Sequence, residues 1–299
     1  MTEKNIRTNN NSGAVSAGNT AADTGAGAKT RPALEVLVVA RDENVIMLSE
    51  HMNLSTEAII CNQCHEVAYQ EYEHRGRRIR AFDFDEKGVG LNRNNALMRA
   101  EGEIVVFADE DIVYDDRYEE KILKEFERNP RADVLMFNVK AAENRGTYEN
   151  IRHKRVRWYN YGRYPTYSMC CRLDALRRTN VCFSLLFGGG AKYSNGEDTL
   201  FIHDCLKRGL RIYAVPVGIG REMSREGGES TWFKGFSEKF FYDRGVLYRY
   251  LYGAAARLWA VRFILAKKEE MCREIPAKRA LGLMFKGIRE AYKGQSYEG

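Results

Sequence analysis

The sequence lacks several features, and each absence excludes a class of protein. No run of about 18 apolar residues is free of charge, which excludes an ordinary transmembrane span. There is no G-x-x-x-x-G-K-[ST] phosphate loop, and Gly88-Val-Gly90 does not extend to the G-x-G-x-x-G pattern of a dinucleotide site. No apolar signal precedes the cysteines, whose number, seven, is odd. We therefore expect a reduced, cytoplasmic protein.

The string Cys61-Asn-Gln-Cys64-His65 matches the C-x-x-C-H pattern of haem attachment. Covalent haem attachment requires export, for which the sequence carries no signal, and no second cysteine pair stands at zinc-like spacing. We interpret the string as the end of a strand with two incidental cysteines.

The net charge of +6 is concentrated at one end of the chain. Residues 244–299 contain 12 Lys and Arg and five Asp and Glu, a net charge of +7, which leaves −1 for the first 243 residues. A basic tail on a nearly neutral body argues against nucleic acid as a partner and favours an anionic surface such as a membrane.

Apolar runs and turn residues divide the chain into three parts. Residues 1–32 are rich in Ala, Gly, Asn, Ser and Thr and are predicted to be a disordered tail. In residues 33–230, buried strands alternate with helices, which predicts an α/β domain whose central sheet is mostly parallel and flanked by helices. The predicted strands are 34–40, 58–61, 79–84, 104–108, 134–139 and 211–215, and the predicted helices are 92–100, 118–127 and 199–208.

Residues 231–299 form a basic, aromatic-rich helical extension. Apolar residues recur there every three or four positions, from Leu247 and Leu251 to Leu258 and Leu265, which predicts one amphipathic helix. This helix could pack on the preceding domain, dock on a membrane, or do both.

Two acidic clusters stand where a parallel sheet places its ligands. Asp109-Glu110-Asp111 directly follows the apolar run 104–108, and three adjacent carboxylates favour a divalent cation shared with phosphate over a simple helix cap. Glu197 and Asp198 begin a helix after the loop Gly188-Gly-Gly190, where Asp198 could either cap the helix or act as a general base.

Taken in order, these motifs resemble the family-2 glycosyltransferases. The resemblance rests on Gly88-Val-Gly-Leu-Asn-Arg93-Asn94, then Gly102-Glu103, the apolar strand ending in Asp109-Glu-Asp111, and Gly196-Glu197-Asp198, and it covers about residues 34–220. It implies a GT-A fold and a nucleoside-diphosphate (NDP) sugar donor. It also implies Mg²⁺ or Mn²⁺ as cofactor and transfer with inversion to a glycan or lipid-linked acceptor, as in the synthesis of bacterial surface polysaccharides.

The resemblance also implies roles for individual residues. Asp109 and Asp111 would bind the metal and Asp109 also the donor, with Arg93 near the nucleotide, while Asp198 would be the base supported by Glu197. We place Arg41 and Asn62, at the ends of the first two strands, on the donor side as well.

The sequence departs from the family pattern in two places. The acidic pair that commonly ends the second strand is replaced by Cys61-Asn62-Gln63, which leaves the nucleobase open. The Gln-x-x-Arg-Trp of processive synthases is absent, with only Ser230-Thr-Trp232 in that region, so we expect addition of a single sugar.

Two other functions remain alternatives: a sugar-phosphate nucleotidyltransferase, and a non-catalytic binding or scaffold module. We also expect the protein to bind the cytoplasmic face of a membrane peripherally, through residues 232–299.

Overall fold

The computed structural model describes residues 31–142, 148–223 and 235–295, and the chain from Arg31 onward forms one compact unit. The predicted tail of residues 1–32 lies outside the described residues except for its last two. Arg31 is held in place, because its guanidinium donates to the carbonyl oxygens of Glu101 and Gly102 and pairs with Asp174 at 3.0 Å. Arg31 therefore packs with the domain that follows it.

The strands are β1 (Leu34–Arg41), β2 (Glu57–Gln63), β3 (Ala68–His74), β4 (Arg77–Phe84), β5 (Ile104–Asp109), β6 (Ile112–Tyr114), β7 (Val134–Lys140), β8 (Lys154–Arg155), β9 (Met169–Arg172) and β10 (Ile212–Glu222). The helices are α1 (Val45–His51), α2 (Val89–Arg99), α3 (Tyr118–Arg128), α4 (Leu173–Thr179), α5 (Glu197–Lys207), α6 (Glu238–Tyr252), α7 (Ala256–Met271) and α8 (Ala277–Gln295). Every strand and helix predicted in residues 33–230 is present within about three residues of its predicted bounds, except that β10 continues to Glu222, well beyond the predicted end at residue 215.

The strands form one sheet in the order β3-β4-β2-β1-β5-β9-β7-β10-β6, with β8 paired to β10. The block β4-β2-β1-β5 is parallel, as is the β7–β10 pair. β3, β6, β8 and β9 pair antiparallel with their neighbours, so the α/β class is confirmed but the sheet is mixed rather than mostly parallel. The antiparallel strands were missed because they are short, or in the case of β3 polar and largely exposed, and so carry no apolar run.

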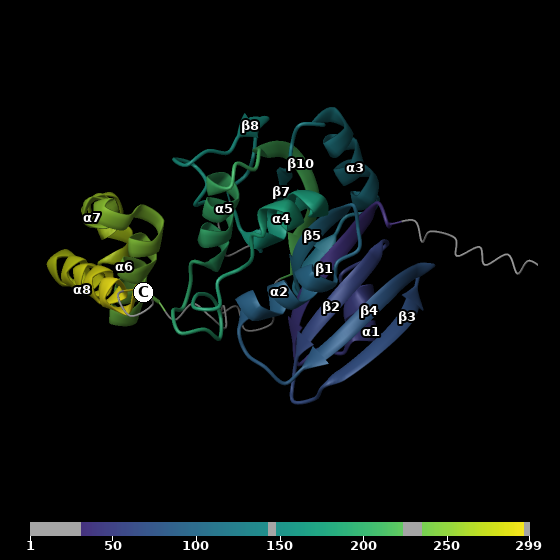
Figure 1. The fold of residues 1–299 in the computed structure, drawn as a ribbon, viewed down its shortest axis with the longest axis horizontal. Helices are drawn as coiled ribbons and strands as arrows, with labels where there is room; N and C mark the ends of the chain where they lie inside the picture. Colours follow the sequence, from purple (N-terminus) through teal and green to yellow (C-terminus); the bar gives the residue numbers. More distant parts are fainter. Residues whose placement is uncertain (1–30, 143–147, 224–234, 296–299) are drawn as a thin grey trace, which may run out of the picture. The chain divides into compact units, whose positions relative to one another are not determined.

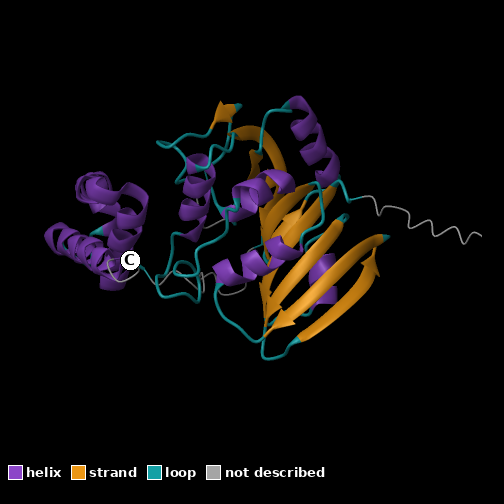
Figure 2. Cartoon of the chain, in the orientation of Figure 1, coloured by secondary structure: helices purple, strands orange, loops and turns teal. Residues whose placement is uncertain are grey.

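Helices cover both faces of the sheet (Figure 2). Val36 and Val38 of β1 belong to the core under α1 and α3, while Leu37 between them belongs to the core under α2, α4 and α5. Alternate residues of a strand point to opposite faces, so a strand buried on both faces needs a continuous apolar run. This is why the sequence of β1 is apolar at nearly every position.

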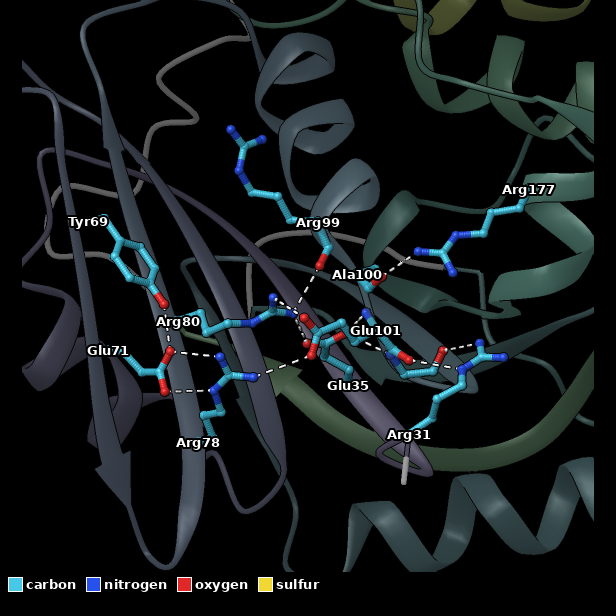
Figure 3. Close-up of polar contacts among 11 residues, drawn as sticks. Arg31, Glu35, Tyr69, Glu71, Arg78, Arg80, Arg99, Ala100, Glu101 and Arg177 are labelled. Carbon is cyan, nitrogen blue, oxygen red and sulfur yellow. Dashed lines mark hydrogen bonds and ion pairs between the residues drawn. The ribbon is translucent and has the colours of Figure 1, made fainter. Parts of the chain in front are cut away.

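A buried ion-pair network fixes the turn between α2 and β5, at the amino end of β1 (Figure 3). Glu35 is only 2% exposed, and its carboxylate accepts from the backbone amides of Glu101 and Gly102 and pairs with Arg80 at 2.8 Å. Arg80 also pairs with Glu101 and donates to the carbonyl oxygen of Arg99. Because every charge in the network has a partner, the end of α2 is held in a defined position on the sheet.

The C-terminal extension is helical, as predicted, but it is not one helix. α6 ends at Tyr252, where Gly253 (φ 53°, ψ −122°) turns the chain into α7. Leu247 and Leu251 are consequently buried against Phe187 and Leu200 of the preceding domain, while Leu258 and Leu265 of α7 are 72% and 68% exposed. The predicted single stripe is therefore wrong.

α8 packs closely on α6 (Figure 1). A Cβ atom at Gly245 or Gly287 would lie about 2 Å from a carbonyl oxygen of the opposite helix, so both positions require glycine for this approach. Among the described helices, none combines the length and apolar character needed to cross a bilayer.

Candidate active site

The carboxyl ends of the parallel strands bring several sequence-predicted residues to one edge of the sheet. In the register of β1, Val39 lies beside Asp109 of β5 and Ala40 beside Asn62 of β2. Arg41 follows at the end of β1, and its backbone amide donates to the carboxylate of Glu110 at 2.6 Å. The first acidic cluster therefore lies next to Arg41, as expected for a ligand site at this edge.

Arg93 of α2 joins the two acidic clusters. Its side chain is 5% exposed, and its guanidinium bonds to Asp109 at 2.8 Å, to Asp198 at 3.0 Å and to Glu197 at 3.3 Å. Burial lowers the pKa of Arg93, but attraction by these carboxylates outweighs burial and raises the pKa above its ordinary value. One cation thus faces three carboxylates, and the site retains an excess of negative charge.

Aromatic rings support Arg93 from one side. Its guanidinium lies 5.4 Å from the centroid of Phe183, which stacks on Phe201 at 4.0 Å. Asn94 holds the backbone of Phe183 through two hydrogen bonds. The side-chain nitrogen of Asn94 donates to the carbonyl oxygen of Phe183, and the side-chain oxygen of Asn94 accepts from the backbone amide of Phe183. Asn94, part of the motif that contains Arg93, therefore positions the ring below it.

Glu197 and Asp198 are the first two residues of α5, but neither caps the helix. Gly196 is the N-cap residue, and the cap has no side-chain hydrogen bond. Asp198 instead accepts through Oδ1 from both Arg93 and the hydroxyl of Thr166. The structure therefore does not support a helix-capping role for Asp198.

Glu197 is the more enclosed of the two carboxyl groups. Burial, together with the charge of Asp198, raises its pKa to about 7, and Arg93 opposes both effects. Part of the enclosure comes from the glycine loop, because a Cβ at Gly188 would lie 2.8 Å from Cδ of Glu197 and 2.7 Å from Val89. Gly188 also has a φ of 105°, so a larger residue there would be strained as well as crowded.

Asp109 and Asp111 flank the turn between β5 and β6. The side chain of Asp109 is 33% exposed and bonds to Arg93, and Asp111 is partly exposed. The described residues contain no group of three or more His, Cys, Asp or Glu side chains arranged around one point as in an all-protein metal centre. Mg²⁺ commonly uses only one or two carboxylates and completes its shell with substrate phosphates and water. A metal held by Asp109 and Asp111 therefore stays a prediction.

Asn62 lies in the interior of the same edge, where its amide is already engaged. It accepts from the backbone amide of Glu43 and donates to the carbonyl oxygen of Glu43 and to Asp83. Its contact with a donor stays a prediction. The sequence analysis missed Asp83, the carboxylate at the end of β4 to which Asn62 donates. Phe82-Asp83-Phe84 ends a predicted strand, so the rule that ligands gather at the carboxyl ends of strands would have drawn attention to it.

Thr166 and Phe183 were also missed. Neither belongs to a recognisable motif, and their contacts with Asp198 and Arg93 join residues far apart in the chain. The two cysteines of the C-x-x-C-H string are free thiols, and His65 is 92% exposed beside Asp85, so the interpretation of this string as a strand end is consistent with its surroundings.

The mixed α/β sheet flanked by helices has the GT-A fold of nucleotide-sugar glycosyltransferases. Residues 61–187 match the family model described as "Glycosyl transferase family 2". This match, over less than half of the chain, supports glycosyltransferase activity and disfavours the nucleotidyltransferase and scaffold alternatives.

Solved structures agree on the fold. Staphylococcus aureus TarS 1-349 in complex with UDP-GlcNAc is 15% identical, with a TM-score of 0.58 over 85% of this chain and 81% of that chain. TarS 1-349 in complex with UDP gives 14% identity and a TM-score of 0.50 over 89% of this chain and 92% of that chain. The longer S. aureus TarS is 15% identical, with a TM-score of 0.55, and the match covers 85% of this chain but 49% of that chain. No curated protein has a significant sequence match to this chain.

Proposed function

We propose that the protein transfers one glycosyl group, with inversion, from an NDP-sugar to a hydroxyl of a glycan or lipid-linked acceptor in surface-glycan synthesis. The observation that carries the proposal is the position of Arg93 between Asp109 on one side and Glu197 and Asp198 on the other. Because these carboxylates meet at one buried guanidinium, the arrangement supports a donor-binding carboxylate and a base in a single site. The UDP-GlcNAc complex of the similar S. aureus structure supports a nucleotide-sugar donor.

Asp198 is the general base in this proposal. Among the described residues, its side chain accepts from Arg93 and Thr166, both at Oδ1, so we assign Oδ2 to accept the proton of the attacking hydroxyl. Attack on the anomeric carbon from the face opposite the leaving diphosphate inverts its configuration, and positive charge develops on the sugar ring in between. Glu197 supports the base by sharing its bond to Arg93.

Asp109 and Asp111 would hold Mg²⁺ or Mn²⁺. The metal would neutralise the charge that develops on the departing diphosphate. The carboxylates need this partner, because without a cation they would repel a diphosphate at the same edge. Arg41, next to Glu110, and Asn62 complete the proposed donor side.

Substitution of the base tests the proposal most directly. Asp198→Asn keeps the size of the side chain and is expected to lower transfer by about 100- to 10,000-fold while leaving donor binding intact. Transfer is measured as release of nucleoside diphosphate in the presence of acceptor, and donor binding as a shift in the thermal unfolding temperature. Asp111→Asn should instead weaken the metal-dependent part of donor binding. Full activity in either purified variant would contradict its assigned role.

We propose further that the helical extension, predicted over residues 232–299, binds an anionic membrane on the cytoplasmic face, where lipid-linked acceptors lie. Leu258 and Leu265 are exposed on α7, and Arg257 and Arg262 are exposed on the same helix. Co-sedimentation with phosphatidylglycerol vesicles, but not with phosphatidylcholine vesicles, is the expected result, and Leu258→Glu should reduce it. Equal sedimentation of the wild type and Leu258→Glu with the phosphatidylglycerol and the phosphatidylcholine vesicles would contradict the proposal.

A further inference from the structure

The loop of residues 186–196 touches both helices that carry the candidate active site. The carbonyl oxygen of Gly189 accepts from the backbone amide of Val89, the first residue of α2, at 2.9 Å. The loop then ends at Gly196, the N-cap residue of α5 and the residue before Glu197. A shift of this loop would therefore move α2 and α5 relative to each other, and with them the guanidinium and the carboxylates that they carry.

The loop is fixed by burial only at its start. Phe187 is fully buried, whereas none of residues 190–196 is. Two backbone hydrogen bonds of 2.9 Å, from the amide of Gly188 to Tyr193 and from the amide of Tyr193 to Leu186, close the loop on itself. Because these bonds are internal, they do not fix the half that leads to α5, which needs an anchor outside the loop.

Asp243 of α6 supplies that anchor. Its side chain is only 2% exposed, and its Oδ2 accepts from the backbone amide of Ser194 at 2.9 Å and from the hydroxyl of Ser194 at 2.7 Å. Lys239, one turn earlier on α6, bonds to the same oxygen and also donates to the carbonyl oxygen of Lys192 at 3.0 Å. The last residues of the loop are thus bonded to α6 at two positions.

The bonds from Ser194 are the stronger part of this anchor. Hydrogen bonds to a charged acceptor are stronger than neutral ones, and a buried carboxylate that loses its donors is costly. The side chain of Lys239 is 59% exposed, so its ion pair contributes less. One turn further along α6, Leu247 packs against Gly196, where a Cβ would lie 2.7 Å from it. The end of the loop is therefore held at two successive turns of α6.

We propose that Asp243 is a positioning residue for the transfer reaction, acting through its bonds to Ser194. These bonds fix the loop, and the loop holds Glu197 and Asp198 against Arg93. This inference rests on the proposed function, since it takes Asp198 as the base. Asp243 itself contacts no reacting group. The catalytic domain then depends on the first helix of the C-terminal extension, whatever α7 and α8 bind.

The test compares two variants of Asp243 with a matched variant of its neighbour, all in the full chain. Asp243→Ala removes the acceptor of both bonds, whereas Asp243→Asn keeps an oxygen that can accept them and removes the charge. Tyr242→Phe is the control, because the hydroxyl of Tyr242 donates to Glu290 of α8 at 2.6 Å and not to the loop. Asp243→Ala and Tyr242→Phe each remove a bond of α6, so both should lower the thermal unfolding temperature.

Hydrogen–deuterium exchange measures the loop directly, without a substrate. In Asp243→Ala, the amides of residues 186–200 should exchange about tenfold faster than in the wild type, because the anchor no longer resists local opening. Exchange of the same amides should be unchanged in Tyr242→Phe. The amides of Tyr193 and Leu200 are the most informative, since each donates a backbone hydrogen bond to a residue of the loop.

Initial rates measure the effect on the chemistry. The substrates are a panel of UDP-, GDP- and dTDP-sugars with water as the acceptor, and release of nucleoside diphosphate is followed. Asp243→Ala should lower kcat about 10- to 100-fold and change the KM for the donor by less than about threefold, because the base is displaced and the carboxylate at the end of β5 is not. Asp243→Asn should recover most of the activity, and Tyr242→Phe should retain the kcat of the wild type.

Unchanged exchange or unchanged kcat in Asp243→Ala, equal losses in Tyr242→Phe, or equal losses in Asp243→Asn would overturn the inference. Failure of the proposed function gives a different result. If wild-type protein releases nucleoside diphosphate from no donor, the proposed function itself is wrong. If wild-type protein is active and Asp243→Ala is equally active, only the positioning role of Asp243 is wrong.

Discussion

Arg93 is the residue on which the arrangement of the carboxylates depends. With its guanidinium removed, Asp109, Glu197 and Asp198 would face one another in a largely buried site without a cation. We expect Arg93→Gln to lower the free energy of unfolding by about 3 to 5 kcal/mol at neutral pH, because an uncompensated buried charge is strongly destabilising. Urea unfolding measures this loss, and Arg289→Gln on the exposed face of α8 should change stability by less than about 0.5 kcal/mol. A loss of similar size in both variants would contradict the role of Arg93.

The raised pKa of Glu197 makes stability depend on pH in a defined direction. Burial raises this pKa from 4.5 to about 7, so between these values the folded protein binds a proton that the unfolded chain releases. The free energy of unfolding should therefore fall as pH rises through this window, with a contribution of about 1 to 3 kcal/mol from Glu197. Glu197→Gln removes this contribution. Urea unfolding of both proteins from pH 5 to 8 measures the difference, and parallel pH profiles would contradict the assignment.

At the scale of the element, α2 is positioned by close backbone contact as well as by its side chains. A Cβ at Gly90 would lie 2.3 Å from the carbonyl oxygen of Ser184, in the segment that carries Phe183 and leads to Gly188. Gly90→Ala should therefore push this segment away from Arg93 and Glu197, lowering transfer activity and costing about 1 to 3 kcal/mol of stability.

Gly282 of α8 is the matched control for that change. A Cβ placed at Gly282 would meet no neighbouring atom within 4 Å, so Gly282→Ala should stabilise the helix by up to about 1 kcal/mol and leave transfer unchanged. Thermal unfolding and initial rates on both variants compare the two positions. Equal behaviour of the two alanine variants would show that the approach of α2 to Ser184 has no influence on the site.

At the scale of the whole molecule, the helical extension is joined to the catalytic domain through α6. Leu247 is 1% exposed, and its side chain lies 2.7 Å from a Cβ placed at Gly196, directly before Glu197 and Asp198. Leu247→Ala should lower the free energy of unfolding by about 2 to 5 kcal/mol and also reduce transfer, since it leaves a cavity behind the start of α5. Leu258→Ala, on exposed α7, should do neither. Urea unfolding and initial rates distinguish the two, and an unaltered Leu247→Ala variant would contradict this coupling.

Much of the fold was predictable because it depends on local patterns. Strands buried on both faces need continuous apolar runs, and those runs correctly located β1, β2, β4, β5 and β7. The antiparallel strands were not predictable in the same way, since β3 is held by cross-strand pairing rather than by burial. The break of the C-terminal helix at Gly253 was missed because its apolar spacing continues across the turn, although half of those residues face the domain and half face outward.

The sequence by itself determined the class of fold and the position of the acidic clusters, because these depend on short motifs and on local burial. Only the tertiary structure decided how the clusters are used. Arg93 bonds to Asp109, 16 positions away, and to Asp198, 105 positions away, and no local pattern encodes which carboxylates one guanidinium will reach. The packing of α2, α5 and the 183–190 segment at one edge of the sheet makes that choice, and it also buries Glu197 and positions Thr166 on the candidate base.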